Sequence, residues 1–180
     1  MLHLVIPARL GSTRLPRKVL RELAGKPMVQ HVWHQAQQVG TASVTIATDS
    51  DEVAQVCRGF GAQVVMTDAA HPSGTDRAAE VAQQLGWADD DIVVNVQGDE
   101  PFLKTEPLKQ LIEVFKNDVE EKISLASLKI KLKDQEEIEN PNNVKVITDR
   151  EGFALYFSRS VIPYPRETAV KAEYFKHIGV

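Results

Sequence analysis

The chain begins with an apolar run that leads directly into a basic loop, LHLVIPARLGSTRLPRK at residues 2–18. Residues 2–6 are almost all apolar, which predicts a buried first strand. From Arg9 to Arg21 there are five cations and no acid, although the whole chain carries a formal net charge of −4. The loop matches neither G-x-G-x-x-G nor G-x-x-x-x-G-K-[ST], the common dinucleotide and P-loop motifs. A basic, glycine-containing loop after a strand nevertheless suits a polyphosphate, with a solvated loop as the alternative.

Composition limits the classes of protein to which the chain can belong. Its 180 residues fit one domain, and a hydrophobic content of 43% is enough for an ordinary core. A pI near 5.7 argues against a dedicated nucleic-acid binder. The longest apolar runs are strand-sized, so no membrane insertion is expected. A signal peptide is not expected either, because the cations follow the apolar run. We therefore expect a cytoplasmic protein.

Strand-like apolar runs alternate with helix-period stretches, which predicts an α/β fold with a mainly parallel sheet. The helical spacing of Cys57, the single cysteine, with Val53 and Phe60 predicts a buried core thiol. The predicted strands are residues 2–6, 43–47, 63–66 and 92–96. The predicted helices are about 28–39, the stretch around Cys57, the stretch 78–85, and about 107–117.

The later part of the chain has a different pattern. Residues 124–130 alternate as in a strand, and a charged stretch follows to Asn140. Two apolar runs, 144–147 and 153–157, flank the turn sequence DREG at 149–152, which predicts a β-hairpin.

In a doubly wound sheet, ligands bind beyond the carboxyl ends of the strands, where the strand order reverses. We expect that reversal between the first strand and the strand at 92–96, if the second and third strands pack on the other side of the first. This order places the Arg9–Lys18 loop beside residues 97–99. A cation-rich loop opposite one carboxylate suits a nucleoside triphosphate with Mg²⁺. Asp99 is therefore the predicted metal ligand, with a helix cap or turn residue as the alternative.

Five blocks of sequence carry a resemblance to a known family. They are IPARLGSTRLP at 6–16, HPSGTDR at 71–77, NVQGDEP at 95–101, NPNNVKV at 140–146 and ALYFSR at 154–159. Together with Lys18 they closely resemble the 3-deoxy-manno-octulosonate cytidylyltransferase family, whose members are also called CMP-KDO synthetases. The resemblance runs in register over the whole 180 residues.

The resemblance implies a fold and a reaction. The fold would be a single Rossmann-like nucleotidyltransferase domain over residues 1–180, with a mixed, mainly parallel sheet and a dimerisation segment within about 120–180. The reaction would join CTP to the acidic sugar 3-deoxy-manno-octulosonate (KDO), giving CMP-KDO and pyrophosphate for lipopolysaccharide biosynthesis. Mg²⁺ would be the cofactor, and the chain would form a homodimer without a nucleic-acid partner.

The resemblance also implies roles for particular residues. Arg9, Arg14 and Lys18 would offset charge on the α-phosphate and on the departing pyrophosphate, and Asp99 would bind Mg²⁺. The sugar acid would contact Arg14, Gln97, Arg159 and His177, since a carboxylate suits the arginine fork. The nucleotide would contact Pro7, Ala8, Arg9, Leu10, Gly11, Ser12, Lys18, Ser73, Gly74, Thr75, Arg77 and Gln97.

Members of the family continue beyond the position of Val180, and that further stretch supplies a second Mg²⁺-binding aspartate. The resemblance therefore implies truncation at the C-terminus, with weak CTP binding and impaired turnover by these 180 residues. Two alternatives stay open. One is a cytidylyltransferase for a related acid sugar, either 8-amino-KDO or a sialic-acid-like sugar. The other is a truncated nucleotide-binding module without turnover.

Overall fold

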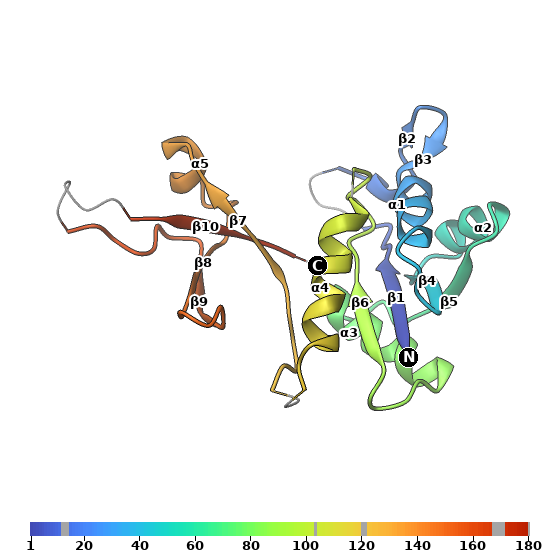
Figure 1. Cartoon of the computed structure of the whole chain (residues 1–180). Helices are drawn as coiled ribbons and strands as arrows, with labels where there is room; N and C mark the ends of the chain where they lie inside the picture. Colours follow the sequence, from blue (N-terminus) through green and yellow to red (C-terminus); the bar gives the residue numbers. More distant parts are fainter. Residues whose placement is uncertain (12–14, 103, 120–121, 167–171, 180) are drawn as a thin grey trace. The chain divides into compact units, whose positions relative to one another are not determined.

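The computed structural model describes residues 1–11, 15–102, 104–119, 122–166 and 172–179. Two compact units make up the chain, Met1–Glu113 and Val114–Gly179 (Figure 1). The predicted dimerisation segment concerns the second unit and stays a prediction, as does the single domain over residues 1–180. None of the described helices has both the length and the apolar character that crossing a bilayer requires.

The first unit is built on a parallel four-stranded sheet. Its strands are β1 (Leu2–Pro7), β4 (Ser43–Thr48), β5 (Gln63–Met66) and β6 (Ile92–Asn95). They lie in the order β5-β4-β1-β6, and all three neighbouring pairs are parallel. The predicted α/β class, the strand positions and the reversal of strand order beside β1 are confirmed.

Four helices connect or follow these strands: α1 (Met28–Gln37), α2 (Asp51–Gly59), α3 (Gly74–Leu85) and α4 (Thr105–Lys116). The side chain of Ser50 caps α2 by accepting from the backbone N–H of Val53. Ser73 caps α3 in the same way by accepting from Asp76. Such caps satisfy backbone donors that the first helical turn leaves unpaired. Gly86 ends α3 because it adopts the left-handed conformation, with φ of 64°.

The sheet is buried on both faces, as a doubly wound arrangement requires. Leu4 and Ile6 of β1 join one apolar cluster, which includes Val29 and Val32 of α1. Val5, between them in sequence, joins the other cluster with Val81 of α3. Full burial of each such side chain contributes about 1.5–3 kcal/mol. Alternate residues of β1 therefore pack against helices on opposite faces of the sheet, and this alternation fixes the register of the strand.

Cys57 lies fully buried in the larger of the two apolar clusters. Burial raises the pKa of its thiol to about 12, so the sulfur stays protonated at neutral pH and is a poor nucleophile. The predicted core thiol is confirmed.

A 3-10 helix and a short ribbon between β1 and α1 were not predicted from the sequence. The basic loop leads into the 3-10 helix η1 (Lys18–Leu20), and then into a two-stranded ribbon of β2 (Glu22–Leu23) and β3 (Lys26–Pro27). Ala24 and Gly25 turn the ribbon with φ of 48° and 78°. The side chain of Val19 in η1 is buried in the main core and so anchors the end of the basic loop.

The second unit contains an antiparallel sheet of four strands in the order β7-β10-β8-β9. These are β7 (Leu128–Leu132), β8 (Lys145–Thr148), β9 (Ala154–Ser158) and β10 (Tyr174–Ile178), with the short helix α5 (Gln135–Glu139) after β7. The predicted hairpin is confirmed as β8 and β9. The strand predicted at 124–130 is wrong in its bounds, since it begins at Leu128. The helix α5 lies in the stretch that was predicted only as charged.

Candidate active site

A cleft of about 350 Å³ opens at the carboxyl ends of β1 and β6, entirely within the first unit. Three loops line the cleft. The carboxyl ends of the strands are the place where ligands bind in doubly wound sheets. The lining residues are Pro7, Arg9, Gly11, Leu15, Lys18 and Val19 after β1, His71, Pro72, Ser73, Gly74 and Arg77 at the start of α3, and Gln97, Gly98 and Asp99 after β6. The predicted juxtaposition of the basic loop with residues 97–99 is confirmed.

Two glycines let these loops approach one another. A Cβ atom on Gly98 would lie 2.7 Å from the backbone oxygen of Pro7, closer than side chains come to backbone. A Cβ atom on Gly74 would lie 3.2 Å from the ring of Pro7. Pro7, the last residue of β1, is therefore the point around which the three loops of the cleft are packed.

Lys18 and Asp99 form an ion pair across the cleft. The Lys18 ammonium donates to Oδ2 of Asp99 at 2.6 Å, and the two side chains are 33% and 41% exposed. Both residues were predicted site residues, one for phosphate and one for metal. The structure brings them into direct contact and leaves both accessible to a ligand in the cleft.

Some of the remaining residues of the basic loop line the cleft, and others pack into the core. Arg9 and Gly11 line the cleft. Ala8 is buried, its backbone N–H donating to Ala47 at 2.8 Å, and Leu10 packs against the core. Contacts of these two with a nucleotide would therefore come from backbone groups. The predicted site residues Ser12 and Arg14 lie outside the described residues.

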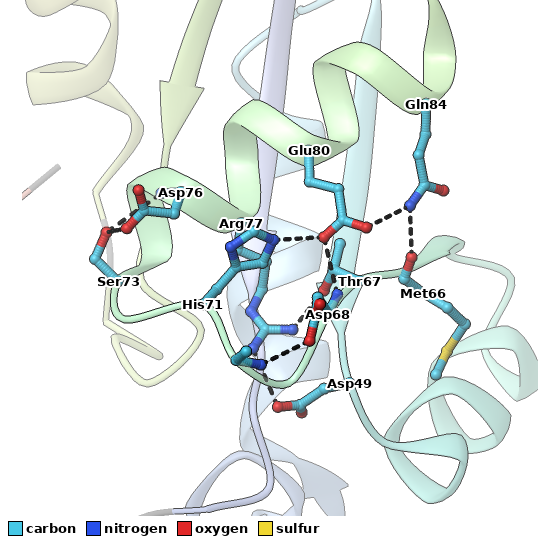
Figure 2. A network of polar contacts seen from close by, with 11 residues as sticks. Asp49, Met66, Thr67, Asp68, His71, Ser73, Asp76, Arg77, Glu80 and Gln84 are labelled. Carbon is cyan, nitrogen blue, oxygen red and sulfur yellow. Dashed lines mark hydrogen bonds and ion pairs between the residues drawn. The ribbon is translucent and has the colours of Figure 1, made fainter.

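Arg77 is a buried residue in the wall of the cleft. Only 3% of its side chain is exposed, and its guanidinium donates to Thr67 and, at 3.1 Å, to Oδ2 of Asp49 (Figure 2). These bonds tie α3 to the ends of β4 and β5. The predicted nucleotide residues Ser73 and Gly74 line the cleft beside it, whereas Thr75 is exposed and lies outside the lining.

A second polar network behind the cleft was missed by the sequence analysis. The carboxylate of Glu80 accepts from the backbone N–H of Asp68 at 2.8 Å, from Nε2 of His71 at 2.5 Å and from the amide of Gln84 at 2.8 Å (Figure 2). The bonds from Asp68 and then His71 lower the pKa of Glu80. A glutamate on the polar side of a helix looks like a solvated residue, so no sequence signal marked it.

Arg159 and His177, the predicted sugar-binding residues, lie in the second unit. Nη1 of Arg159 donates to the carbonyl of Pro141 at 2.8 Å. His177 lies on β10, where its ring contacts the hydroxyl of Ser127 at 2.7 Å and forms a T-shaped contact with the ring of Phe157. Burial lowers the pKa of His177, which favours the neutral ring.

Lys145 links the surroundings of these two residues. Its side chain is fully buried on β8, and its ammonium donates to the carbonyls of Asn140, Asn143 and Arg159 at 3.1, 2.8 and 2.6 Å. The neighbouring Val144 carbonyl accepts from the backbone N–H of His177 at 2.8 Å. Arg159 and His177 are therefore held on either side of the start of β8.

A doubly wound parallel sheet with a basic cleft at the reversal of strand order defines an α/β nucleotide-binding protein. The family model of the cytidylyltransferases matches residues 3–180, and the chain belongs to this family. The family resemblance of the sequence blocks is confirmed by relatives named 3-deoxy-manno-octulosonate cytidylyltransferase. The one from Histophilus somni (strain 2336) is 48% identical over an alignment of 188 positions, which covers 98% of this chain and 72% of the relative.

A second relative of that name, from Francisella tularensis subsp. tularensis (strain FSC 198), is 48% identical over 99% of this chain and 73% of its own length. A solved structure of CMP:2-keto-3-deoxy-manno-octonic acid synthetase complexed with CTP matches with a TM-score of 0.90 at 44% identity, over 99% of this chain and 71% of that one. A cytidylyltransferase from Leptospira borgpetersenii, 20% identical with a TM-score of 0.55 over 66% of this chain and 50% of its own, shares the fold. The predicted truncation stays a prediction.

Proposed function

We propose that this protein is a cytidylyltransferase that joins CTP to KDO, releasing CMP-KDO and pyrophosphate for lipopolysaccharide biosynthesis. The observation that carries the proposal is the cleft at the strand reversal, where Arg9 and Lys18 face Gly98 and Asp99. The fold around it matches that of the CTP complex over 99% of the chain. The curated relatives are named for the same sugar acid.

The residues of the cleft suit transfer of a nucleotidyl group. The anomeric hydroxyl of the sugar would attack the α-phosphorus while pyrophosphate leaves from the opposite side. Lys18 and Arg9 supply positive charge where negative charge develops, and fixed charges of this kind carry much of the rate in such reactions. Arg14 is proposed for the same role from the resemblance. The packed loops around Pro7 hold these groups in place, which supports a positional contribution as well.

Mg²⁺ is the proposed cofactor, and the donor set of the cleft fits it. Asp99 offers a carboxylate that lines the cleft and is 41% exposed. Mg²⁺ prefers one or two carboxylates together with phosphate oxygens and retained water. Asp99 would hold the ion at the nucleotide, where the ion neutralises charge on the phosphates. The Lys18 ammonium, which now holds that carboxylate, would then turn to the phosphates.

A homodimer in the cytoplasm is the proposed state of the protein. Large apolar side chains are exposed on the β8–β9 hairpin, namely Phe153, Leu155, Tyr156 and Phe157. Large apolar side chains that gather on one exposed element are typical of protein interfaces. Light scattering should give twice the chain mass, and Tyr156→Asp should shift it toward the monomer, whereas Arg150→Asp in the turn should not. CTP is a cytoplasmic nucleotide, and cell fractionation would test the location.

The reaction is tested by two measurements on the same preparation. A thermal shift with CTP reports nucleotide binding, and pyrophosphate release with KDO, 8-amino-KDO and a sialic acid reports turnover and sugar choice. Release with KDO above the other acids supports the proposal. Release with another acid sugar would change the substrate. CTP binding without release would identify a binding module, and equal affinity for ATP and CTP would contradict the cytidylyltransferase assignment.

A further inference from the structure

His71 borders the cleft on one side and a carboxylate on the other. His71 is one of the lining residues, and 23% of its side chain is exposed. Its Nε2 atom lies 2.5 Å from Oε2 of Glu80, which projects from α3 (Figure 2). The function proposed above uses neither residue.

The hydrogen bonds around Glu80 determine which ring nitrogen of His71 carries a hydrogen. Because the Asp68 N–H and the His71 ring both lower the pKa of Glu80, its carboxylate is ionised at neutral pH. An ionised carboxylate only accepts hydrogen bonds, so Nε2 of His71 must be the donor. In the neutral ring the other nitrogen, Nδ1, is then an acceptor.

The loop that carries His71 is fixed at several points. The backbone N–H of Thr67 donates to Thr48 at 2.9 Å, and that of Ala70 donates to the side chain of Asp68 at 2.8 Å. Gln84 of α3 bridges the carbonyl of Met66 at 2.9 Å and the carboxylate of Glu80. Glu80 thus holds both ends of the loop 68–71, and the ring of His71 is positioned by the same carboxylate.

The cationic groups that line the cleft supply donors rather than acceptors. Arg9, Lys18 and Arg77 carry only N–H groups, and the lining carboxylate of Asp99 already accepts from Lys18. A nucleoside brings donors of its own, the ribose hydroxyls and, in cytidine, the 4-amino group. These donors need acceptors in the cleft, because a polar group that loses water without a partner weakens binding.

We propose that His71 is a further nucleotide-binding residue, which accepts a hydrogen bond from a donor of the nucleoside through Nδ1, and that Glu80 is the positioning residue that holds this tautomer. The inference rests on the proposed function, because it takes the ligand of the cleft to be CTP. It assigns the acceptor that the cations of the cleft lack.

Two substitutions of His71 separate the two ring nitrogens. Gln places its amide nitrogen near the position of Nε2, so His71→Gln retains a donor for Glu80 and loses the Nδ1 acceptor. Asn places its oxygen near the position of Nδ1, so His71→Asn retains an acceptor and loses the bond to Glu80. Calorimetric titration with CTP should give a Kd raised about tenfold for His71→Gln, as expected for one lost hydrogen bond. His71→Asn should bind CTP more tightly than His71→Gln.

Nucleotide analogues identify the donor and exclude a merely structural role. CTP, UTP, 2′-deoxy-CTP and 3′-deoxy-CTP are titrated against the natural protein and against His71→Gln. The affinity loss caused by the substitution should disappear for the analogue that lacks the paired donor. A loss that is the same for all four nucleotides would overturn the proposal, as would a CTP affinity unchanged in His71→Gln.

Glu80→Gln tests the positioning role without changing the lining of the cleft. It should weaken CTP binding and leave the turnover number in saturating CTP within about twofold, because Glu80 lies outside the lining of the cleft. The matched control is Glu139→Gln. Glu139 is exposed on α5, and its carboxylate also accepts a hydrogen bond from a glutamine amide. Unchanged CTP affinity in Glu80→Gln would overturn this role. A natural protein that fails to bind CTP would instead contradict the proposed function.

Discussion

The ammonium of Lys18 and the carboxylate of Asp99 lie 2.6 Å apart and join the basic loop to the loop after β6. Both side chains are partly exposed, and ion pairs of this kind stabilise a fold by about 0–1 kcal/mol. The pair can therefore be separated at little cost when phosphates and a cation enter the cleft. Until a ligand binds, the ion pair neutralises the two charges and holds both side chains at the cleft.

Replacement of Asp99 by Asn removes the charge and retains the shape. Turnover should fall by at least about 10²-fold because the proposed metal ligand and the partner of Lys18 are both lost. The free energy of unfolding should change by less than about 1 kcal/mol, since the pair is exposed. Pyrophosphate release at saturating Mg²⁺ and a thermal melt check both values. A variant that melts far lower but remains active would assign Asp99 a structural role.

The cations of the basic loop should differ in their effect on catalysis. Lys18→Ala and Arg9→Ala should each lower kcat/KM by about 10²–10⁴-fold if these groups stabilise charge in the transition state. Arg17→Ala is the matched control on the same loop, because its guanidinium pairs with Glu52 and lies outside the lining of the cleft. Steady-state kinetics with varied CTP separates the cases. Loss confined to KM would assign the two cations to ground-state binding, and no loss would favour a solvated loop.

Gly98→Ala should distort the cleft through backbone contact. Its Cβ would meet the oxygen of Pro7 at 2.7 Å, and this oxygen belongs to β1, which is packed on both faces. Overpacking of this kind costs about 1–3 kcal/mol. Gly59→Ala, in α2 with open space around the new Cβ, is expected to be neutral or stabilising. Urea unfolding of both variants, with CTP binding, tests the contrast; equal stability of the two would contradict the close packing around Pro7.

The two central strands of the first unit, β1 and β4, could be predicted from the sequence because they are buried on both faces. Such strands are rich in apolar residues, and the bounds predicted from residues 2–6 and 43–47 are close to those of β1 and β4. In the second unit β7 reads LKIKL, with exposed lysines, and the preceding SLAS also mixes apolar and polar residues. Alternation alone therefore could not place the start of that strand.

The lining of the cleft was predictable to the extent that its residues follow strands in sequence. Gln97 and Asp99 come directly after β6, and their approach to the basic loop followed from the strand order. The contact of His71 with Glu80 joins a loop to a helix nine residues later. Neither periodicity nor a strand end marks such a pair, so it required the structure.

The ion pair between the buried Arg77 and the partly buried Asp49 should be important for stability. Asp49→Ala leaves the guanidinium with Thr67 as its remaining partner among the bonds described here, and loss of a hydrogen bond to a charged group costs about 1.5–3 kcal/mol. In a protein that already carries Arg77→Met, Asp49→Ala should cost much less stability, because the guanidinium charge of Arg77 has been removed. A double-mutant cycle by urea unfolding measures this coupling. Additive effects of the two substitutions would contradict a direct interaction.

Glu80 should give the protein an acid-sensitive contribution to stability. Its pKa is lowered in the folded protein from the ordinary value of 4.5, first by the Asp68 N–H and then by His71. A carboxyl group with a lowered pKa stabilises the fold above its unfolded pKa, and this contribution is lost as the pH falls through the folded pKa. The contribution of the Glu80 carboxylate, measured as the stability difference between the natural protein and Glu80→Gln, should therefore be fully present at about pH 5.5. It should shrink as the pH falls below 4.5, when measured by urea unfolding at each pH. Glu139→Gln should show no such trend. A stability difference between the natural protein and Glu80→Gln that stays constant down to pH 3 would contradict an ionised, hydrogen-bonded Glu80 carboxylate. The proposed tautomer of His71 depends on that carboxylate.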